Sequence, residues 1–321
     1  MVINVKNTIF FIFAVLTSLI ILVNLKTTNQ GLVVDIKPGS SLKEISINLE
    51  ENNIISSSLL FILYAKALGR DKEIKAGEYL FLNKESINTA QLKLIKGDIY
   101  YRKLQLKEGM TIKDVLNLAH EAKGIVDDIK RDTELLNEKI NRKGQFEGML
   151  YPDTYYYKKG DKFSSILLRA FEKQTNLYDL MWKERKKGLP YNSFLEALTL
   201  ASIIEKEGLE KRQIAGVFIN RLHKNMKLQS DPTVIFALGE KFDGNIRRKD
   251  LTIKHPYNTY RYKGLPPGPI GLVGLDSMQA ALNPIETNFL YFVSMGNGYH
   301  KFSNNLEEHN KAVLKYQINA R

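Results

Sequence analysis

Near the start of the chain, residues 7–25 form a run of nineteen uncharged positions between Lys6 and Lys26. Most of them are Ile, Leu, Val, Phe or Ala, and no polar face interrupts the run. A helix of this length spans about 28 Å at 1.5 Å per residue, which matches the apolar thickness of a bilayer. The pattern predicts a single transmembrane helix within residues 1–30. A cleaved signal peptide and a buried soluble helix are the alternatives, and the run lacks the small-x-small cleavage site of a signal peptide.

Between residues 31 and 98, short apolar runs alternate with stretches whose apolar residues recur at helical spacing. This pattern predicts a small α+β unit. We expect strands at 32–34 and 78–82 and helices at 42–52, 57–68 and 89–96.

The remaining residues, 99–321, carry a larger set of helical patterns and two further strand patterns. We expect strands at 101–107 and 290–293 and helices at 111–122, 163–174, 192–207, 211–224, 276–283 and 306–318. The fold class predicted for the whole chain is therefore α+β, with an anchor (1–30), a small unit (31–98) and a larger α+β body (99–321).

Composition narrows the chemistry of the chain. Its 321 residues have room for about two domains. The absence of cysteine excludes disulfides, thiolate nucleophiles and cysteine-bound metals. The five histidines show no metal-binding spacing, so we expect neither a metal nor a cofactor. The net charge of +12 favours an anionic partner, although a solvated lysine-rich surface explains it equally well.

The most informative segment is the predicted helix at 192–207. Eight of the eleven residues from 194 to 204 are apolar, and they fall all around the helix, which is typical of a helix buried on most sides. Two carboxyl groups, those of Glu205 and Glu207, lie in its last turn. Such groups are either solvated charges at an emerging helix end or a general acid in an apolar setting.

Helical spacing favours Glu207 as the general acid. Leu200, Ile203 and Ile204 share its face and can form an apolar collar around it. Desolvation and the negative end of the helix dipole both raise the pKa of a carboxyl group there, as an acid at neutral pH requires. Glu205 faces smaller and more polar side chains, so it is the alternative catalytic residue.

Polar groups are dense downstream of this helix, including a proline-rich loop from Tyr257 to Gly268. Turns use Asn, Ser, Pro and Gly for backbone reasons alone. Together, however, the amides, hydroxyls and aromatic rings suit the binding of sugar hydroxyls and sugar faces. The candidate substrate-binding residues are Asn220, Gln229, Ser230, Asp231, Asn258, Thr259 and Tyr260.

Seven motifs follow one another along the chain, at 147–155, 201–207, 217–222, 228–234, 257–260, 264–268 and 309–310. In sequence and in order they resemble the YceG/MltG family of endolytic murein transglycosylases. The resemblance runs from the anchor to the end of the chain. One departure is visible, because Gly208 stands where other members carry Thr.

The resemblance implies a LysM-like subdomain at 31–98 and a transglycosylase catalytic domain at 99–321. It also implies that one helix anchors the protein in the cytoplasmic (inner) membrane, and that both domains lie on the outer side of that membrane. It implies a lyase that cuts nascent peptidoglycan between N-acetylmuramic acid and N-acetylglucosamine, leaves 1,6-anhydro-muramic ends and thereby stops strand elongation. The family's catalytic glutamate matches Glu207. Penicillin-binding proteins and other wall synthases are the implied partners.

One carboxyl group can serve both steps of such a reaction, first as acid and then as base for the sugar's own C6 hydroxyl. A hydrolase would need a second carboxylate, for which Glu205, Glu147 and Asp231 are candidates. Two other classes are a wall-binding protein without catalysis and a nucleic-acid binder. We expect no nucleic acid as a partner, because the chain has no nucleic-acid reader motif.

Overall fold

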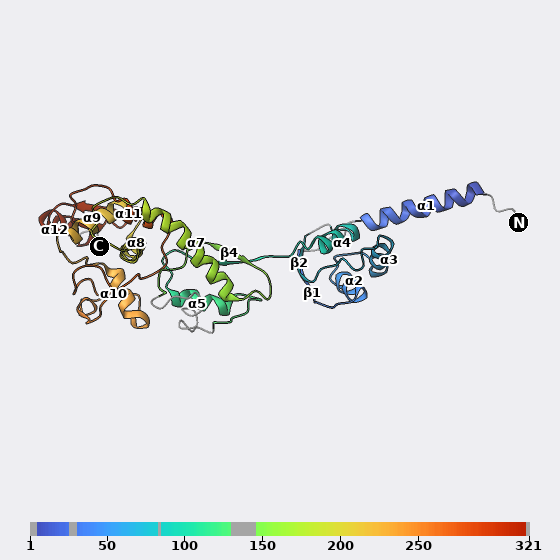
Figure 1. Ribbon diagram of the computed structural model, residues 1–321, viewed down its shortest axis with the longest axis horizontal. Coiled ribbons are helices and arrows are strands. Elements are labelled where there is room, and N and C mark those ends of the chain that lie inside the picture. Colours follow the sequence, from blue (N-terminus) through green and yellow to red (C-terminus); the bar gives the residue numbers. More distant parts are fainter. Residues whose placement is uncertain (1–4, 26–30, 83–84, 130–145, 319–321) are drawn as a thin grey trace. The chain divides into compact units, whose positions relative to one another are not determined.

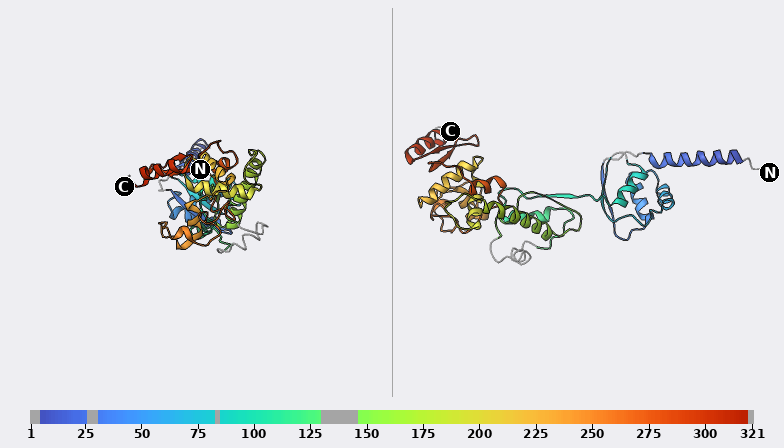
Figure 2. Two further views of the ribbon diagram at one scale, coloured as in Figure 1. Left: turned by 90° about the vertical axis from the view of Figure 1, so that its left-hand side faces the viewer. Right: turned by 45° about the horizontal axis from the view of Figure 1, so that its top comes forward.

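The computed structural model describes residues 5–25, 31–82, 85–129 and 146–318 (Figures 1 and 2). The chain divides into two compact units, Met1–Arg102 with Tyr156–Gly160, and Lys103–Tyr155 with Asp161–Arg321. Residues 99–102 and 156–160, which the sequence patterns grouped with the larger region, thus belong to the first unit. Helices occur together with small two-stranded sheets, so the predicted α+β class is confirmed.

The uncharged run near the start forms helix α1, Val5–Asn24. Val23 lies in the core of the first unit, whereas Phe10 and Phe13 are exposed. Within the part of the chain that the structure describes, no helix combines the length and the apolar character needed to cross a bilayer. The transmembrane prediction is therefore not confirmed. Residues 1–4 and 26–30 of the predicted anchor lie outside the described residues.

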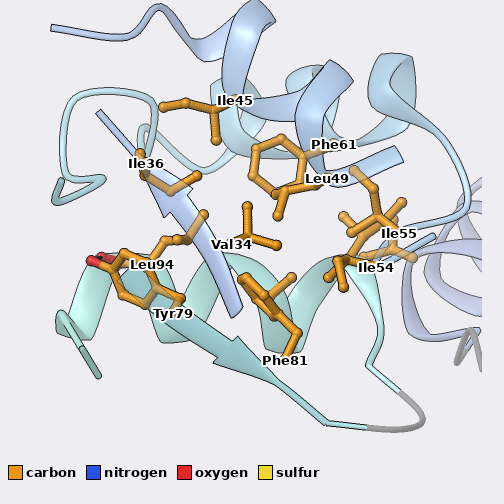
Figure 3. Packing of buried hydrophobic residues seen from close by; sticks show 13 residues of the cluster. Val34, Ile36, Ile45, Leu49, Ile54, Ile55, Phe61, Tyr79, Phe81 and Leu94 are labelled. Atoms are coloured by element: carbon orange, nitrogen blue, oxygen red, sulfur yellow. Dashed lines mark hydrogen bonds between the residues drawn. The ribbon is translucent and has the colours of Figure 1, made fainter. Parts of the chain in front are cut away.

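The first unit has a two-stranded antiparallel sheet, in which Leu32 of β1 lies opposite Phe81 of β2. Its chain order is strand, helix, helix, strand, helix: β1 (Leu32–Ile36), α2 (Leu42–Glu51), α3 (Ser58–Ala67), β2 (Gly77–Phe81) and α4 (Ile87–Lys96). Apolar side chains from all five elements meet in one core, including Val34, Leu49, Phe61, Phe81 and Leu94 (Figure 3).

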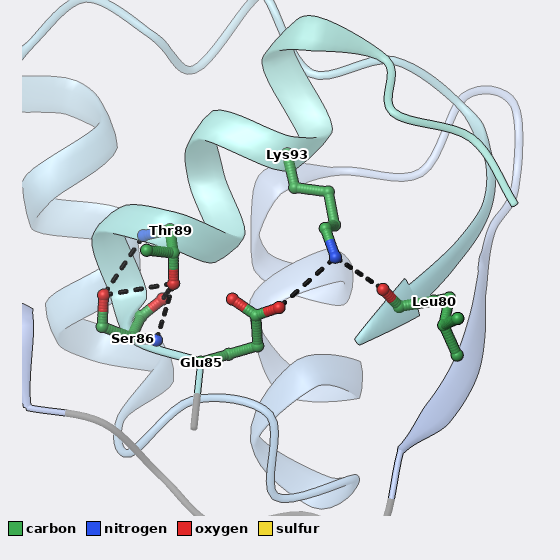
Figure 4. Close-up of polar contacts among 5 residues, drawn as sticks. All are labelled: Leu80, Glu85, Ser86, Thr89 and Lys93. Atoms are coloured by element: carbon green, nitrogen blue, oxygen red, sulfur yellow. Dashed lines mark hydrogen bonds and ion pairs between the residues drawn. The ribbon is translucent and has the colours of Figure 1, made fainter. Parts of the chain in front are cut away.

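Helix α4 is fastened at both its start and its middle (Figure 4). At the start, the Ser86 hydroxyl accepts a hydrogen bond from Thr89 N (3.2 Å), and the Thr89 hydroxyl accepts one from Ser86 N (2.8 Å), which is a capping box. In the middle, Lys93 Nζ donates to Leu80 O (2.6 Å) and pairs with Glu85 (3.3 Å). These contacts hold α4 against the end of β2.

The second unit contains all the helices predicted for it. They are α5 (Ile112–Glu121), α7 (Phe163–Lys183), α8 (Phe194–Glu207), α9 (Lys211–His223), α11 (Leu275–Leu282) and α12 (Leu306–Val313), the last followed by a wider turn at Leu314–Ile318. Two of the strands were predicted, β3 (Arg102–Gln105) and β5 (Tyr291–Ser294).

Several elements escaped the sequence patterns. They are β4 (Thr154–Tyr157), which pairs with β3, α10 (Asp231–Leu238), β6 (His300–Ser303), which pairs with β5, and short 3-10 turns at Gly239–Lys241 and Asp250–Thr252. Helix α10 begins inside the segment that reads as a polar turn, because Asp231 and Pro232 suit the first turn of a helix as well as they suit a turn.

Candidate active site

Helix α8 carries the two candidate carboxyl groups, those of Glu205 and Glu207, in its last turn. It begins at a capping box between Ser193 and Glu196, and every residue from Ala197 to Ile204 is buried. Helices α9, α10 and α11 pack against it. Ile270 N, just after the proline-rich loop, donates to the buried Ser202 hydroxyl (3.0 Å) and so holds this segment to the helix. The helix is thus fixed by burial, as its all-round apolar pattern predicts, and its last turn is held rigidly.

Glu207 lines a cavity of about 820 Å³, here called the Glu207 cavity. Ser230 Oγ donates a hydrogen bond to Glu207 Oε1. Burial of the carboxyl group raises its pKa to about 7, and the charge of Asp231 acts in the same direction, whereas the Ser230 hydrogen bond and Arg221 act against it. A carboxyl group with this pKa can be protonated or ionised near neutrality, which is the property of a general acid–base.

Glu205 has a different environment. Its side chain is 5% exposed, it pairs with Lys211 of α9, and its Oε2 accepts a hydrogen bond from Gly274 N (2.9 Å) at the start of α11. Lys211 also donates to Ser277 of α11 (2.9 Å). Glu205 therefore joins three helices. Helical spacing led us to expect that Glu205 faces smaller and more polar side chains. In the structure its carboxylate contacts a cation and a backbone amide instead.

The turn beside Glu207 is held in an uncommon conformation. Gln229 lines the cavity with a φ of 50°, in the left-handed region that side chains other than glycine rarely adopt. Ser230 stands at the N-cap position of α10 but makes no side-chain capping hydrogen bond, and its hydroxyl donates to Glu207. The buried Thr259 holds this turn, since its hydroxyl accepts from Ser230 N (3.0 Å) and its carbonyl from Gln229 N (3.2 Å).

Asp231 and Tyr260 form a second polar pair on the cavity wall. Tyr260 Oη donates to Asp231 Oδ1 (2.5 Å). Burial, together with this hydrogen bond and the charge of Asp231, raises the pKa of Tyr260, so the phenol keeps its proton. Of the candidate substrate-binding residues, Gln229, Asp231 and Tyr260 line the cavity with Glu207.

Three other candidates have side chains that hold the protein's own backbone. Asn258 is fully buried and donates to Leu251 O (3.0 Å) and Ile253 O (2.9 Å). Asn220 donates to Thr287 O (2.7 Å) and Phe289 O (3.0 Å). With Thr259, they shape the walls around the site, and Ser230 touches the acid rather than the cavity.

Sequence reasoning missed the far wall of the cavity, which comes from β5, β6 and α12. Arg221 connects that wall to the turn beside Glu207, because its guanidinium donates to Leu290 O (2.7 Å) and Leu228 O (2.6 Å). Tyr291 stacks on His309 of α12 with ring centroids 5.1 Å apart, and both line the cavity. The motifs at 217–222 and 309–310 contained Arg221 and His309, but residue type alone did not indicate their roles.

Glu147 also has a pKa near neutrality. Burial raises it to about 7, while hydrogen bonds from Ile112 N (3.0 and 3.2 Å) and the charge of Lys206 act against the rise. Its carboxyl group thus accepts from the start of α5, away from the cavity lining. Among the described residues, no three His, Asp or Glu side chains are grouped so as to hold a metal ion.

Comparisons with known proteins show which chains this one is similar to. The model of the YceG-like family matches residues 34–315. The chain is 35% identical over 313 residues to an endolytic murein transglycosylase of Bacillus subtilis (strain 168), covering 91% of this chain and 86% of that protein. It is 30% identical over 331 residues to one of Streptococcus pneumoniae R6, covering 90% and 59%. A crystallised YceG-like protein of Listeria monocytogenes is similar at a TM-score of 0.52 and 34% identity, covering 89% of this chain and 100% of that one.

Proposed function

The chain belongs to the YceG-like family, and we propose that it is an endolytic murein transglycosylase. It is a lyase that cuts peptidoglycan strands internally between N-acetylmuramic acid and N-acetylglucosamine and leaves 1,6-anhydro-muramic ends. By cutting nascent strands it stops their elongation. The observation that carries the proposal is Glu207, a carboxyl group with a pKa of about 7 on the wall of a cavity of about 820 Å³.

Glu207 serves both proton transfers. In its neutral form it gives its proton to the glycosidic oxygen as the bond from that oxygen to C1 breaks. The resulting carboxylate takes the proton of the same sugar's C6 hydroxyl while the C6 oxygen bonds to C1. Proximity favours this hydroxyl over water. The Ser230 hydroxyl, which donates to Glu207 Oε1, stabilises the carboxylate between the two steps.

A hydrolytic reaction would need a second carboxylate for water. Glu205 is engaged by Lys211 and Gly274, and Glu147 by the start of α5. Asp231 lines the cavity but accepts the hydrogen bond of Tyr260. We assign Asp231 to holding Tyr260 and to raising the pKa of Glu207, and not to activating water.

The test uses purified, uncrosslinked glycan strands in water enriched in ¹⁸O. The wild-type protein should release fragments with anhydro-muramic ends and no label, and Glu207→Gln should release none. Label at the new ends would make the enzyme a hydrolase. Strand binding with no cleavage by the wild-type protein would favour a wall-binding protein without catalysis.

A further part of the proposal is that residues 31–98 are a LysM-like subdomain. The support is that these residues form a small α+β unit of their own, with the order β1–α2–α3–β2–α4 and antiparallel strands. A protein lacking residues 31–98 should then bind strands more weakly than the full chain. Equal binding would contradict the LysM-like assignment.

We also propose that the protein is held in the cytoplasmic membrane, with its catalytic unit on the outer side. The support is the sequence alone, with nineteen uncharged positions at 7–25. Recovery of a soluble form that begins after about residue 25 in fractionated cells would contradict this. Penicillin-binding proteins and other wall synthases are the proposed partners, and cross-linking in cells is the test.

A further inference from the structure

His300 lines the Glu207 cavity and has no part in the mechanism above. It lies at the start of β6, with its ring edge-on to Phe292 at 5.3 Å. Glu210, just before α9, holds it at two points. The Glu210 carboxylate accepts from His300 N (3.2 and 3.0 Å), and one of its oxygens lies 2.7 Å from His300 Nδ1. The two side chains are 9% and 16% exposed, so the ring is fixed in position.

The contact with Glu210 decides which ring nitrogen carries the hydrogen. A carboxylate can only accept a hydrogen bond, so His300 Nδ1 must donate. In the neutral ring the other nitrogen, Nε2, then has a free lone pair. His300 Nε2 has no hydrogen-bond partner among the residues that the structure describes. In the neutral ring, Glu210 therefore makes His300 Nε2 an acceptor on a residue of the cavity wall.

Gly208 makes room for this ring directly after Glu207. A Cβ atom at position 208 would lie 2.6 Å from Cε1 of His300, closer than such atoms pack, and 3.3 Å from its Nδ1, a tight contact. Any side chain at this position would move the ring away from its place on Glu210. Gly208, which departs from the family pattern, thus leaves the space that the His300 ring occupies in this chain.

We propose that His300 is a substrate-binding residue, whose Nε2 accepts a hydrogen bond from a hydroxyl group of the sugar next to the cleaved bond. This rests on the proposed function, because it takes the ligand of the cavity to be a glycan. Hydroxyl groups are the most numerous donors on a glycan, and an acceptor fixed at the cavity wall can bind one of them. Glu210 and Gly208 are positioning residues that act through His300.

The experiment measures the affinity of uncrosslinked glycan strands for proteins that carry Glu207→Gln, so that binding is read without cleavage. In this parent, His300→Phe keeps a ring of similar size but removes the acceptor. It should weaken binding about tenfold, the effect of losing one hydrogen bond of ordinary strength. His223→Phe, at an exposed histidine at the end of α9, is the matched control and should bind like the parent. Unchanged affinity for His300→Phe overturns the proposal.

Glu210→Gln is the second variant, and it decides the outcome if His300→Phe does not fold. The amide can donate to Nδ1 and so move the ring hydrogen to Nε2, which then no longer accepts. We expect about threefold weaker binding, and affinity equal to that of the parent overturns the proposal. If the wild-type protein makes no anhydro ends, the proposed function fails; if it makes them and His300→Phe binds normally, only this inference fails.

A double-mutant cycle tests the role of Gly208. Gly208→Ala alone should weaken binding about as much as loss of the His300 contact, because it displaces the ring. In a protein that also carries His300→Ala the space is empty, so Gly208→Ala should add little. Equal losses in both backgrounds would overturn the link between the two residues.

Discussion

Glu205 and Glu207 lie two residues apart at the end of α8, yet they belong to different regions of the second unit. Glu205 lies in the packing layer between α8, α9 and α11, where Lys211 and Gly274 N satisfy its charge. Glu207 faces a cavity and a hydroxyl group, and its pKa rises to about 7. In a buried region a carboxyl group with a cation partner stabilises the fold. With a neutral partner and a cavity beside it, the same group can act as a proton donor.

Glu147 sharpens this comparison. Its pKa is also about 7, but its carboxyl group accepts from the backbone at the start of α5. A raised pKa is therefore shared by a structural and a candidate catalytic carboxyl group. Contact with a cavity large enough for a substrate separates the two.

The largest expected effect is that of Glu207→Gln on cleavage. Gln keeps the size of the side chain and can accept from Ser230, but it cannot give a proton to the glycosidic oxygen. Because one group serves both steps, turnover should fall by about 10³–10⁴, at the upper end for a general acid–base. Release of anhydro-muramic fragments, measured by mass spectrometry, is the readout. Normal turnover by this variant would remove Glu207 from the mechanism.

Glu205→Gln should act on stability instead. It leaves Lys211 in the packing layer without its anion, so the free energy of unfolding should fall by about 3 kcal/mol. Turnover per folded molecule should stay within about threefold of wild type. Urea denaturation and the same cleavage assay measure the two quantities. A stable but inactive Glu205→Gln would exchange the roles of the two residues.

The pH dependence should follow the raised pKa of Glu207. Cleavage needs the protonated acid, so kcat/KM should fall as the pH rises through about 7. Between the unfolded value of 4.5 and about 7, the folded chain holds a proton that the unfolded chain has lost, so stability falls as the pH rises. Between pH 5 and pH 8 this group should lower the free energy of unfolding of the wild-type protein by about 2 kcal/mol. Glu207→Gln should not show this part of the pH dependence. The same pH dependence of unfolding in both proteins would contradict the assigned pKa.

The smallest expected effects compare two residues of one loop. Asn258→Ala removes the donor to two backbone carbonyls and should lower the free energy of unfolding by about 2 kcal/mol, with nearly normal turnover per folded molecule. Tyr260→Phe should leave stability almost unchanged and reduce turnover a few-fold, because Tyr260 lines the cavity. Thermal unfolding and initial rates distinguish them, and the reverse pattern would show that Asn258 contacts the glycan.

The parts of the fold and of the candidate site that depend on neighbouring residues in the chain could be predicted from the sequence. The buried helix α8 and the rank of Glu207 over Glu205 came from spacing within one helix. The structure of the segment Ser230–Pro232 was ambiguous, because these residues are common both in turns and at the start of helices. The sequence led us to expect that Asn258 contacts the glycan. An amide side chain indicates that the residue will make hydrogen bonds, but the residue type does not identify the partner. Its partners are backbone carbonyls, and no side-chain pattern identifies those.

The far wall of the cavity could not be predicted for another reason. His300 pairs with Glu210, 90 positions earlier in the chain, and Arg221 donates to Leu290 O, 69 positions later. Such pairings depend on how the elements pack, and periodicity within a segment carries no information about them. The same holds for Gly208, whose importance is visible only once the ring of His300 lies against it.

The separation between the acid and the far wall also affects when the enzyme becomes competent during its synthesis. Helix α8 is complete at Glu207, but Gln317, the last residue on the cavity wall, is added about 110 residues later. At ordinary ribosomal speeds this is a delay of roughly 5–20 s. Throughout that interval the nascent chain carries Glu207 without a complete cavity around it. Cutting activity therefore begins only after the hairpin β5–β6 and α12 have left the ribosome and folded onto the rest of the unit.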